Sequence, residues 1–585
     1  AYLNEVTERY GSKEFLVLTY TPRESMISDV SINNLLSLKY KIESLNWVHS
    51  VITLLDIPLL NSSDEPLNER LQNFKTLKDE NIDRNRGFKE ILNSPVFRNF
   101  VISEDGKTSG IIVNIKEKEK LKNIKTIPKK EIEKFKDQIK KQNHKNILEI
   151  REVIKTFEPV AKIYLGGIPM IADDMMTFIK SDIIVFGLGV LLFIIATLWF
   201  VFRKLIWIIV PISSCLFSVI IMMGLLGILG WKVTVISSNF IALMLILTMA
   251  MNIHMSTRFL QIKKQFPKKN NFEVLLLTTS KMFWPILYTV LTTICAFLSL
   301  IFSEIKPIID FGWMMTFGLI TSFIITFTLL PTLLNFTPTK NISIKKEESS
   351  KITNFFSVIS INNKKTIFLL TGVVIILSII GITRLEVENS FINYFNKKTE
   401  IYKGMKLIDE KLGGTTPLEV ILKFPETQNE DNSDEGDEFE DWGEEEDAND
   451  EKYWFTKDKI SKITSVHNYL DSLPQVGKVL SFSSIIDVAT QLNNNKPLGT
   501  LEMGVLYSKI PNNIKTEIID PYISIKNNEA RINLRIIDSQ ENLRRDDLLK
   551  KINFDLKNKI GLEESEFKLA GVLILFNNLL QSLFK

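Results

Sequence analysis

Long uncharged stretches alternate with blocks rich in Lys and Glu along this chain. A helix that crosses the hydrocarbon core of a bilayer, about 30 Å thick, needs roughly 20 apolar residues. Six stretches approach that length, and they are residues 183–202, 205–229, 233–255, 285–302, 308–334 and 367–382. Six such runs rarely share one soluble core, so the pattern predicts a polytopic α-helical membrane protein.

The loops between these stretches differ in charge. Basic residues favour the cytoplasmic side of a membrane. Nearly all of the loop Lys and Arg residues fall in three alternate loops, at 203–204, 258–281 and 340–365. The two large hydrophilic regions, residues 1–180 and 385–568, are therefore predicted to lie outside the cytoplasm.

The two hydrophilic regions also resemble each other. Three pairs of segments recur in the same order, namely 11–22 with 414–425, 45–54 with 473–482, and 165–176 with 569–580. Their offsets are 403, 428 and 404 residues, and the rise of 25 equals the length of an acidic tract at 427–451, which we interpret as an insertion. Each copy runs strand, helix, strand, strand, helix, strand, which predicts two extracytoplasmic α+β domains of the ferredoxin-like type.

The repeat also predicts how the chain is divided. Copy one leads into a span, whereas copy two stops at Lys585, and Ala1 corresponds to a point just after a span. We therefore expect part of a twelve-span protein, incomplete at both ends and built as two parallel halves. The expected parts are a first domain at 1–180, spans two to six at 181–338, a cytoplasmic linker at 339–364, span seven at 365–384, a second domain at 385–568, and an approach helix to span eight at 569–585.

Composition narrows the function classes. The net charge of +3 gives no reason to expect nucleic acid as a partner. Cys215 and Cys295 lie in apolar runs, so neither a disulfide nor a thiolate metal site is indicated. No phosphate-cradling loop, nucleophile elbow or zinc-ligand spacing is present, so we expect neither an enzyme nor a bound cofactor or metal. The acidic tract is expected to be a solvated loop, with a cation-binding or partner-contact loop as the alternative.

Several segments carry a family resemblance. WPILYTVLTTICAFLSL at 284–300, KPIIDFG at 306–312 and LLPTL at 329–333 resemble the fifth and sixth spans of the resistance-nodulation-division (RND) superfamily, and within it the MMPL-like exporters. Residues 385–395 and 412–419 are similar to the start of that family's second porter domain. The positions that match the family's motifs are Arg258, Thr293, Pro307, Gly312 and Pro331.

The resemblance implies an RND-type secondary transporter in the inner (plasma) membrane, with extracytoplasmic porter domains. It implies export of a hydrophobic, amphiphilic or lipid-like substrate, driven by the proton gradient. The implied partners are membrane lipid, that substrate and protons, and a homo-oligomer or a periplasmic partner is left open. Relatives of the same architecture serve other tasks, so a non-transporting receptor, lipid-sensing or accessory protein is the alternative.

The fourth span departs from the family's pattern. The family carries an Asp four residues before a His that is itself four before an Arg; here His254 and Arg258 match, but the acidic position is Ala250. The candidates for proton coupling are therefore His254, Asn252 and Asp310. For His254 the alternative is an interfacial anchor beside Arg258, and for Asp310 a solvated carboxylate at a helix start.

Overall fold

The fold is known from a computed structural model. It describes residues 2–10, 15–62, 75–79, 82–116, 128–231, 233–234, 236–303, 305–337, 351–384, 390, 392–425, 454–493, 496–497, 499, 502–504, 507, 515, 519–540 and 543–584. The predicted insertion at 427–451 lies outside these residues. The chain forms two compact units, one of residues 1–174 with 389–581 and one of residues 175–388 with 582–585.

The second unit is built from long apolar helices. Their bounds are Ile168–Phe202 (α6, which starts in the first unit), Ile206–Ile228 (α7), Phe240–Gln265 (α8), Asn271–Leu298 (α9), Lys306–Asn335 (α10), Lys351–Asn362 (α11) and Lys364–Ile382 (α12). By length and composition, six of the helices in the described part of the chain can cross a membrane, α6 to α10 and α12. The chain is therefore an integral membrane protein, as the apolar pattern predicts.

Two of these helices differ from their predicted bounds. The third span was predicted from residue 233, but helix α8 begins at Phe240, after a short 3-10 turn at Ile236–Asn239. The Thr234 backbone N–H donates to Ser237 Oγ at 2.8 Å, and this local bond competes with helical pairing just before the turn. Helix α9 begins 14 residues before its predicted start, because Asn270 caps it by accepting from the Asn271 N–H at 2.7 Å.

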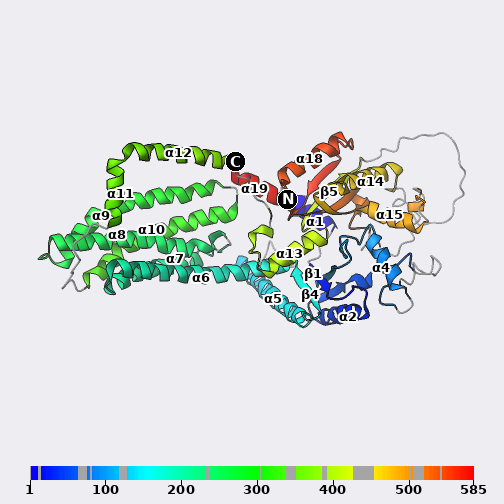
Figure 1. The fold of residues 1–585 in the computed structure, drawn as a ribbon, viewed down its shortest axis with the longest axis horizontal. Coiled ribbons are helices and arrows are strands. Elements are labelled where there is room, and N and C mark those ends of the chain that lie inside the picture. Colours follow the sequence, from blue (N-terminus) through cyan, green and yellow to red (C-terminus); the bar gives the residue numbers. More distant parts are fainter. Residues whose placement is uncertain are drawn as a thin grey trace. The chain divides into compact units, whose positions relative to one another are not determined.

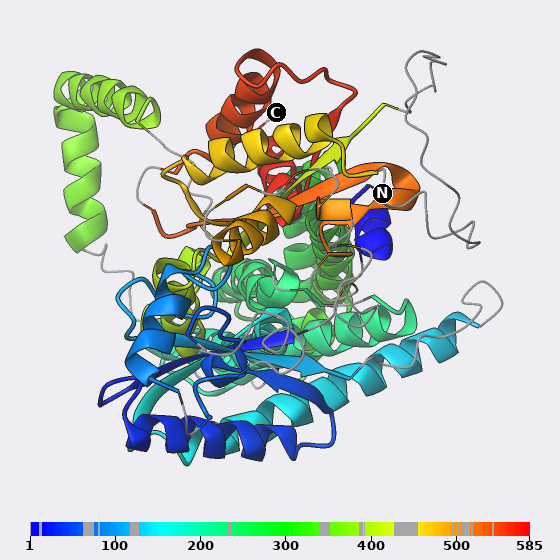
Figure 2. The ribbon, with the colours of Figure 1, turned by 90° about the vertical axis from the view of Figure 1, so that its right-hand side faces the viewer.

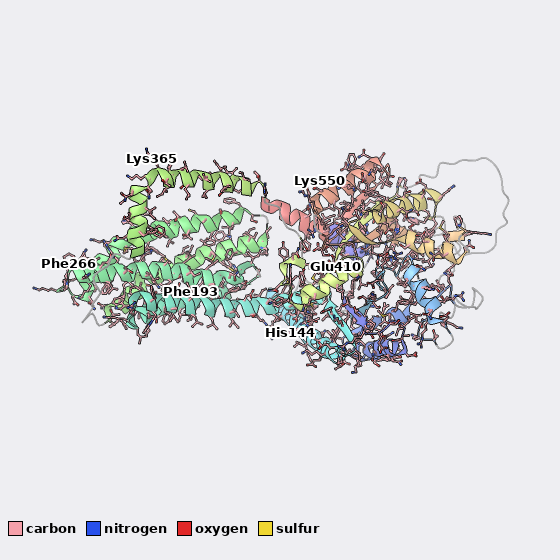
Figure 3. The ribbon with its side chains drawn as sticks, in the orientation of Figure 1. His144, Phe193, Phe266, Lys365, Glu410 and Lys550 are labelled. Carbon is pink, nitrogen blue, oxygen red and sulfur yellow. The ribbon has the colours of Figure 1, made fainter. Side chains whose placement is uncertain are left out.

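Helices α6 to α10 run side by side in Figure 1. Half of the apolar window of α7 and of α8 is buried, and a third of that of α10, whereas α6 and α9 are 11% buried and α12 is not buried. Helices α7, α8 and α10 thus supply most of the interior of this bundle. Large apolar side chains such as Phe193 project from the outer helices (Figure 3), as they must where lipid is the solvent.

The first unit contains two small antiparallel sheets. The first copy comprises Phe15–Pro22 (β1), Asp29–Glu43 (α2), Val48–Ile52 (β2), Arg84–Asn93 (α4), Ser109–Ile115 (β3), Lys129–Lys155 (α5) and Ala161–Gly166 (β4). Its strand order is β2-β3-β1-β4, and helices α2 and α5 lie side by side (Figure 2). Period-two burial along β1, with Leu16, Leu18 and Tyr20 fully buried, gives this sheet its core.

The second copy has the same strand order. It comprises Thr416–Lys423 (β5), Lys457–Asp471 (α14), Val476–Leu480 (β6), Phe482–Leu492 (α15), Ile523–Ser524 (β7), Glu529–Ile536 (β8), Arg545–Asn558 (α18) and Phe567–Ala570 (β9), followed by Val572–Phe584 (α19). Its sheet runs β6-β8-β5-β9, with β7 on β8. A core of Val, Leu, Ile and aromatic side chains lies between this sheet and its helices.

Strand pairing aligns the two copies residue by residue. Leu18 pairs with Ile111 and Leu165, as Val420 pairs with Ile532 and Leu569. The predicted offsets of 428 at β2 and 404 at β4 agree with this alignment, and both β2 and β6 shift register after their first residue. The first predicted offset of 403 is wrong by one, since Leu18 and Val420 are 402 apart; flanking Gly and Pro residues outside the paired core do not fix register.

The extra residues of copy two lie where the sequence placed them. Helices α2 and α14 have equivalent N-caps, Ser28 and Thr456, each accepting from the backbone N–H three residues on. These caps are 428 residues apart, like β2 and β6. The additional length therefore falls between β5 and α14, the connection that contains the acidic tract.

Each copy is covered by a helix that precedes the other copy's first strand. Helix α1 (Tyr2–Tyr10) contacts β9, with Val6 against Ile421 and Ala570. Helix α13 (Glu400–Lys411) packs on β4 and β1. This reciprocal exchange joins the two copies into one compact unit.

Gly404 makes the approach of α13 possible. A Cβ added there would lie 2.8 Å from the Leu165 carbonyl oxygen and 3.2 Å from Tyr164 Cβ. We expect Gly404→Val to lower the free energy of unfolding of this unit by about 1–3 kcal/mol through overpacking. Thermal unfolding of the detergent-solubilised chain measures this, and Gly381→Val, on α12 with nothing within 4 Å of its added Cβ, is the control. An equal loss in both variants would contradict the close packing.

A buried charged cluster fixes the end of β8. Asp538 and Arg545, 2% and 4% exposed, form an ion pair, and Asp538 Oδ2 accepts from Ser390 Oγ at 2.9 Å. The Asp409 carboxylate, at the end of α13, accepts from the Asp538 N–H at 2.9 Å and the Ser539 N–H at 2.7 Å. The cluster therefore ties α13 to the segment between β8 and α18.

Candidate functional site

The interior of the helical bundle contains a line of small polar side chains. Helices α7, α8 and α10 each contribute members spaced four residues apart, which places them on one face of each helix. This buried polar network consists of Ser214, Cys215, Ser218, Thr248, Asn252, Ser256, Ser322 and Thr326. All eight are at most 1% exposed. Polar groups buried at this depth in a bilayer need partners within the protein.

One end of the network is a chain of hydroxyl groups. Thr248 Oγ1 lies 2.7 Å from Ser322 Oγ, which lies 3.0 Å from Ser218 Oγ. A hydroxyl both donates and accepts, so the direction of donation along this chain can reverse. The three helices are thereby connected by bonds that can point either way.

Asn252 forms the other end. Its Oδ1 accepts from Thr326 Oγ1 at 2.9 Å, and its Nδ2 donates to the Pro211 carbonyl oxygen at 3.0 Å. The same Nδ2 lies 3.6 Å from Cys215 Sγ, whose thiol donates to the Leu245 carbonyl oxygen at 3.7 Å. Asn252 therefore holds one helix on each side of α8.

Two members of the network have unused hydrogen-bonding capacity. The Oγ atoms of Ser214 and Ser256 are fully buried and have no hydrogen-bond partner among the residues that the structure describes. Buried hydroxyls of this kind are places where ordered water is held. The network thus has room for further hydrogen-bonded groups.

The sequence-predicted residues are not brought together. Asn252 lies in the network, but His254 is exposed, because two residues along a helix turn the side chain to the opposite face. Asp310 is half-buried in the first turns of α10. Ala250 and His254, one turn apart, share an exposed face of α8, and Arg258 Nη1 donates to Gln261 Oε1 at 3.1 Å.

The motif-matching residues of α9 and α10 serve helix geometry. A Cβ on Gly312 would lie 2.7 Å from the Phe297 carbonyl oxygen, so this glycine lets α10 approach α9. Thr293 Oγ1 donates to the Thr289 carbonyl oxygen at 2.7 Å. Pro307 occupies the first turn of α10, where its missing N–H costs nothing, and Pro331 lies inside the helix.

Sequence reasoning missed most of the network. It named Asn252 for its polarity but not Ser218, Thr248, Ser322 or Thr326. The available signal was the spacing of Ser, Thr and Asn four apart within apolar helices, a pattern typical of membrane helix interfaces.

The first unit contains a polar cavity between its two copies. Its volume is about 410 Å³, and its lining includes Asn99, Glu104, Asp105, Glu410 and Lys411. Lys411 Nζ donates to Asp105 Oδ2 at 2.9 Å, and this bond holds the pKa of the Asp105 carboxyl well below its usual range. This mainly charged lining gives no apolar wall for an acyl chain. Among the described residues, no group of three or more His, Cys, Asp or Glu side chains is arranged to hold a metal ion.

Comparison with known proteins gives one match. A family model described as the MMPL family matches residues 59–359, just over half of the chain. The matched range extends from the first sheet to helix α11 and includes the whole buried polar network. No curated protein matches the chain.

Proposed function

The chain belongs to the MMPL family of membrane transporters, and from that premise we propose that it is part of a secondary transporter that exports a hydrophobic, amphiphilic or lipid-like substrate. The observation that carries the proposal is the buried polar network. Helices that serve only as anchors have no need of eight fully buried polar side chains, whereas a transporting bundle uses such groups for coupling or for switching between packings.

In this proposal the two sheets belong to ferredoxin-like porter domains at residues 1–180 and 385–568. Both lie on the extracytoplasmic side of the inner membrane, because six spans, an even number, separate them and because the basic loops are on the other side. The identical strand orders of the two sheets support the assignment. Residues 339–364 form the cytoplasmic linker, and residues 569–585 lead towards a further span.

Transport is driven by the proton gradient in this proposal, with His254 as the titrating group. Its imidazole occupies the face of α8 that also carries Ala250, and imidazole is the side chain that changes charge near neutral pH. Asn252 and its partners then act as the hydrogen-bonded packing element that responds to that charge. Asp310, half-buried at the start of α10, is the second acidic candidate.

Reconstituted vesicles test the function. We expect an imposed proton gradient to drive a fluorescent phospholipid analogue between leaflets in vesicles containing the full-length protein. His254→Gln is expected to lower the gradient-dependent rate at least tenfold, because glutamine keeps polarity but cannot titrate. His49→Gln, in the first copy, is the matched control and should leave the rate unchanged.

The same assay separates the alternative function. Within the described parts of the six candidate spans, no carboxylate occupies the bundle interior, and Ala250 stands at the family's acidic position; both observations favour a receptor or lipid-sensing protein. Saturable lipid binding with no gradient-dependent movement would establish that alternative and refute transport.

A further inference from the structure

The two copies join the helices that follow them through equivalent contacts of different chemistry. In the first copy, α5 contacts the first turns of α6, the helix that continues into the first candidate span. In the second copy, α18 stands in the place of α5 and α19 in the place of α6. Figure 3 labels His144 on α5, the residue that distinguishes the two contacts.

Buried positions establish the equivalence of α5 and α18. Three apolar residues on α5 are each 402 residues from an apolar residue on α18, and the pairs are Ile147 with Leu549, Ile150 with Ile552, and Ile154 with Leu556. The same spacing places His144 opposite Asp546. Strands β4 and β9 are 404 apart, which makes Asp173 on α6 equivalent to Asn577 on α19.

In the first copy the contact can carry charge on both sides. His144 Nδ1 lies 2.9 and 3.0 Å from the two carboxylate oxygens of Asp173. The Asp173 side chain is 7% exposed, whereas that of His144 is 50% exposed and open to water. A proton on the imidazole therefore turns a neutral hydrogen bond into an ion pair with a buried carboxylate.

In the second copy the contact contains an amide. Asn577 Nδ2 donates to Asp546 Oδ1 at 3.1 Å, and Lys550 Nζ lies 2.5 Å from Asp546 Oδ2. Between pH 5.5 and 8 neither an amide nor a lysine paired in this way changes charge. The two copies thus share a contact, and histidine chemistry is found at one of them.

The charged groups around His144 are already paired. Arg151 Nη2 donates to Asp174 Oδ2 at 2.9 Å, and its Nε lies 3.2 Å from Glu400 Oε2 of α13. Lys145, beside His144 on α5, is 3.7 Å from Glu149. Within this set His144 is the group whose side-chain type changes charge between pH 5 and 8.

We propose that His144 and Asp173 form a proton-binding site, outside the bundle interior, that tightens the attachment of the first copy to α6 when the imidazole is protonated. The sign follows from the geometry: a proton on His144 strengthens the contact, so the first turns of α6 are held more firmly at pH 5.5 than at pH 8. The site reads the proton concentration of the water around the first unit. The inference does not depend on transport.

Hydrogen exchange of the full chain in detergent tests the site. After correction for chemical exchange, we expect protection in a peptide covering residues 168–178 to rise about threefold to tenfold from pH 8 to pH 5.5, the range of a partly exposed ion pair. The peptide covering residues 572–582 is an internal control with no such rise. Equal responses in the two peptides, or no response in the first, would overturn the proposal without any variant.

Two substitutions assign the effect to the pair. His144→Gln keeps a donor that cannot titrate, and Asp173→Asn makes the first contact resemble the second. Each is expected to abolish the rise in protection, and the double variant should add nothing further. Persistence of the rise in His144→Gln would show that another group binds the proton and would end this assignment.

Discussion

Replacing Arg545 with methionine is expected to lower the free energy of unfolding of the two-sheet unit by about 3–5 kcal/mol. The substitution leaves the Asp538 carboxylate 2% exposed and without its cation. Hydrogen exchange in β8 of the detergent-solubilised chain reports this free energy, because β8 is the strand that pairs with both β5 and β6.

Lys551→Met, an exposed position on the same helix, is the matched control and should change the free energy by less than about 0.5 kcal/mol. Combining Arg545→Met with Asp538→Asn should recover part of the loss, since the uncompensated charge is then removed. A cost below about 1 kcal/mol for Arg545→Met alone would mean that the cluster does not hold α13 and α18 as described.

Replacing Thr326 with valine is expected to reduce gradient-dependent lipid movement at least tenfold and to destabilise the bundle by about 1–2 kcal/mol. Valine keeps the shape of threonine but removes the hydroxyl that donates to Asn252 Oδ1 at 2.9 Å. The amide oxygen of Asn252 is then left buried without its donor. Vesicle assays and thermal unfolding measure the two effects.

Thr328 supplies the matched control on the same helix. Its hydroxyl is exposed and donates to the Ile324 carbonyl oxygen at 2.7 Å, a bond that contributes nothing between helices. Thr328→Val should therefore leave both readouts unchanged. If the two valine variants behave alike, the buried polar network has no part in function.

The helices and the repeat follow from local patterns that a sequence displays. Uncharged runs of about 20 residues predicted six spans, and six candidate spans are present, because satisfying the backbone inside lipid leaves few alternatives to a helix. The equivalence of 45–54 with 473–482 was visible because both segments become β2 and β6 with the same register shift. Ends were less predictable: α9 starts at an Asn cap outside the apolar run.

The candidate site was harder to predict because it depends on which faces of helices meet. Asn252 and His254 are two residues apart and equally polar in the sequence, yet one is fully buried and the other exposed. Ser218 and Ser322 are 104 residues apart and meet at 3.0 Å only once α7 packs on α10. The exchange of α1 and α13 between the copies is likewise set by tertiary packing, which no local pattern encodes.

The account rests on both copies lying on one side of a membrane that the six helices cross, and labelling of single cysteines in sealed cells tests this directly. In a Cys295→Ala background, we would introduce Tyr40→Cys on α2, Phe554→Cys on α18 and Lys268→Cys between α8 and α9, all at exposed positions. A membrane-impermeant maleimide added outside should label the first two, and the third only after the cells are opened. Labelling of the cysteines at 40 and 554 from opposite sides of the membrane would contradict the account.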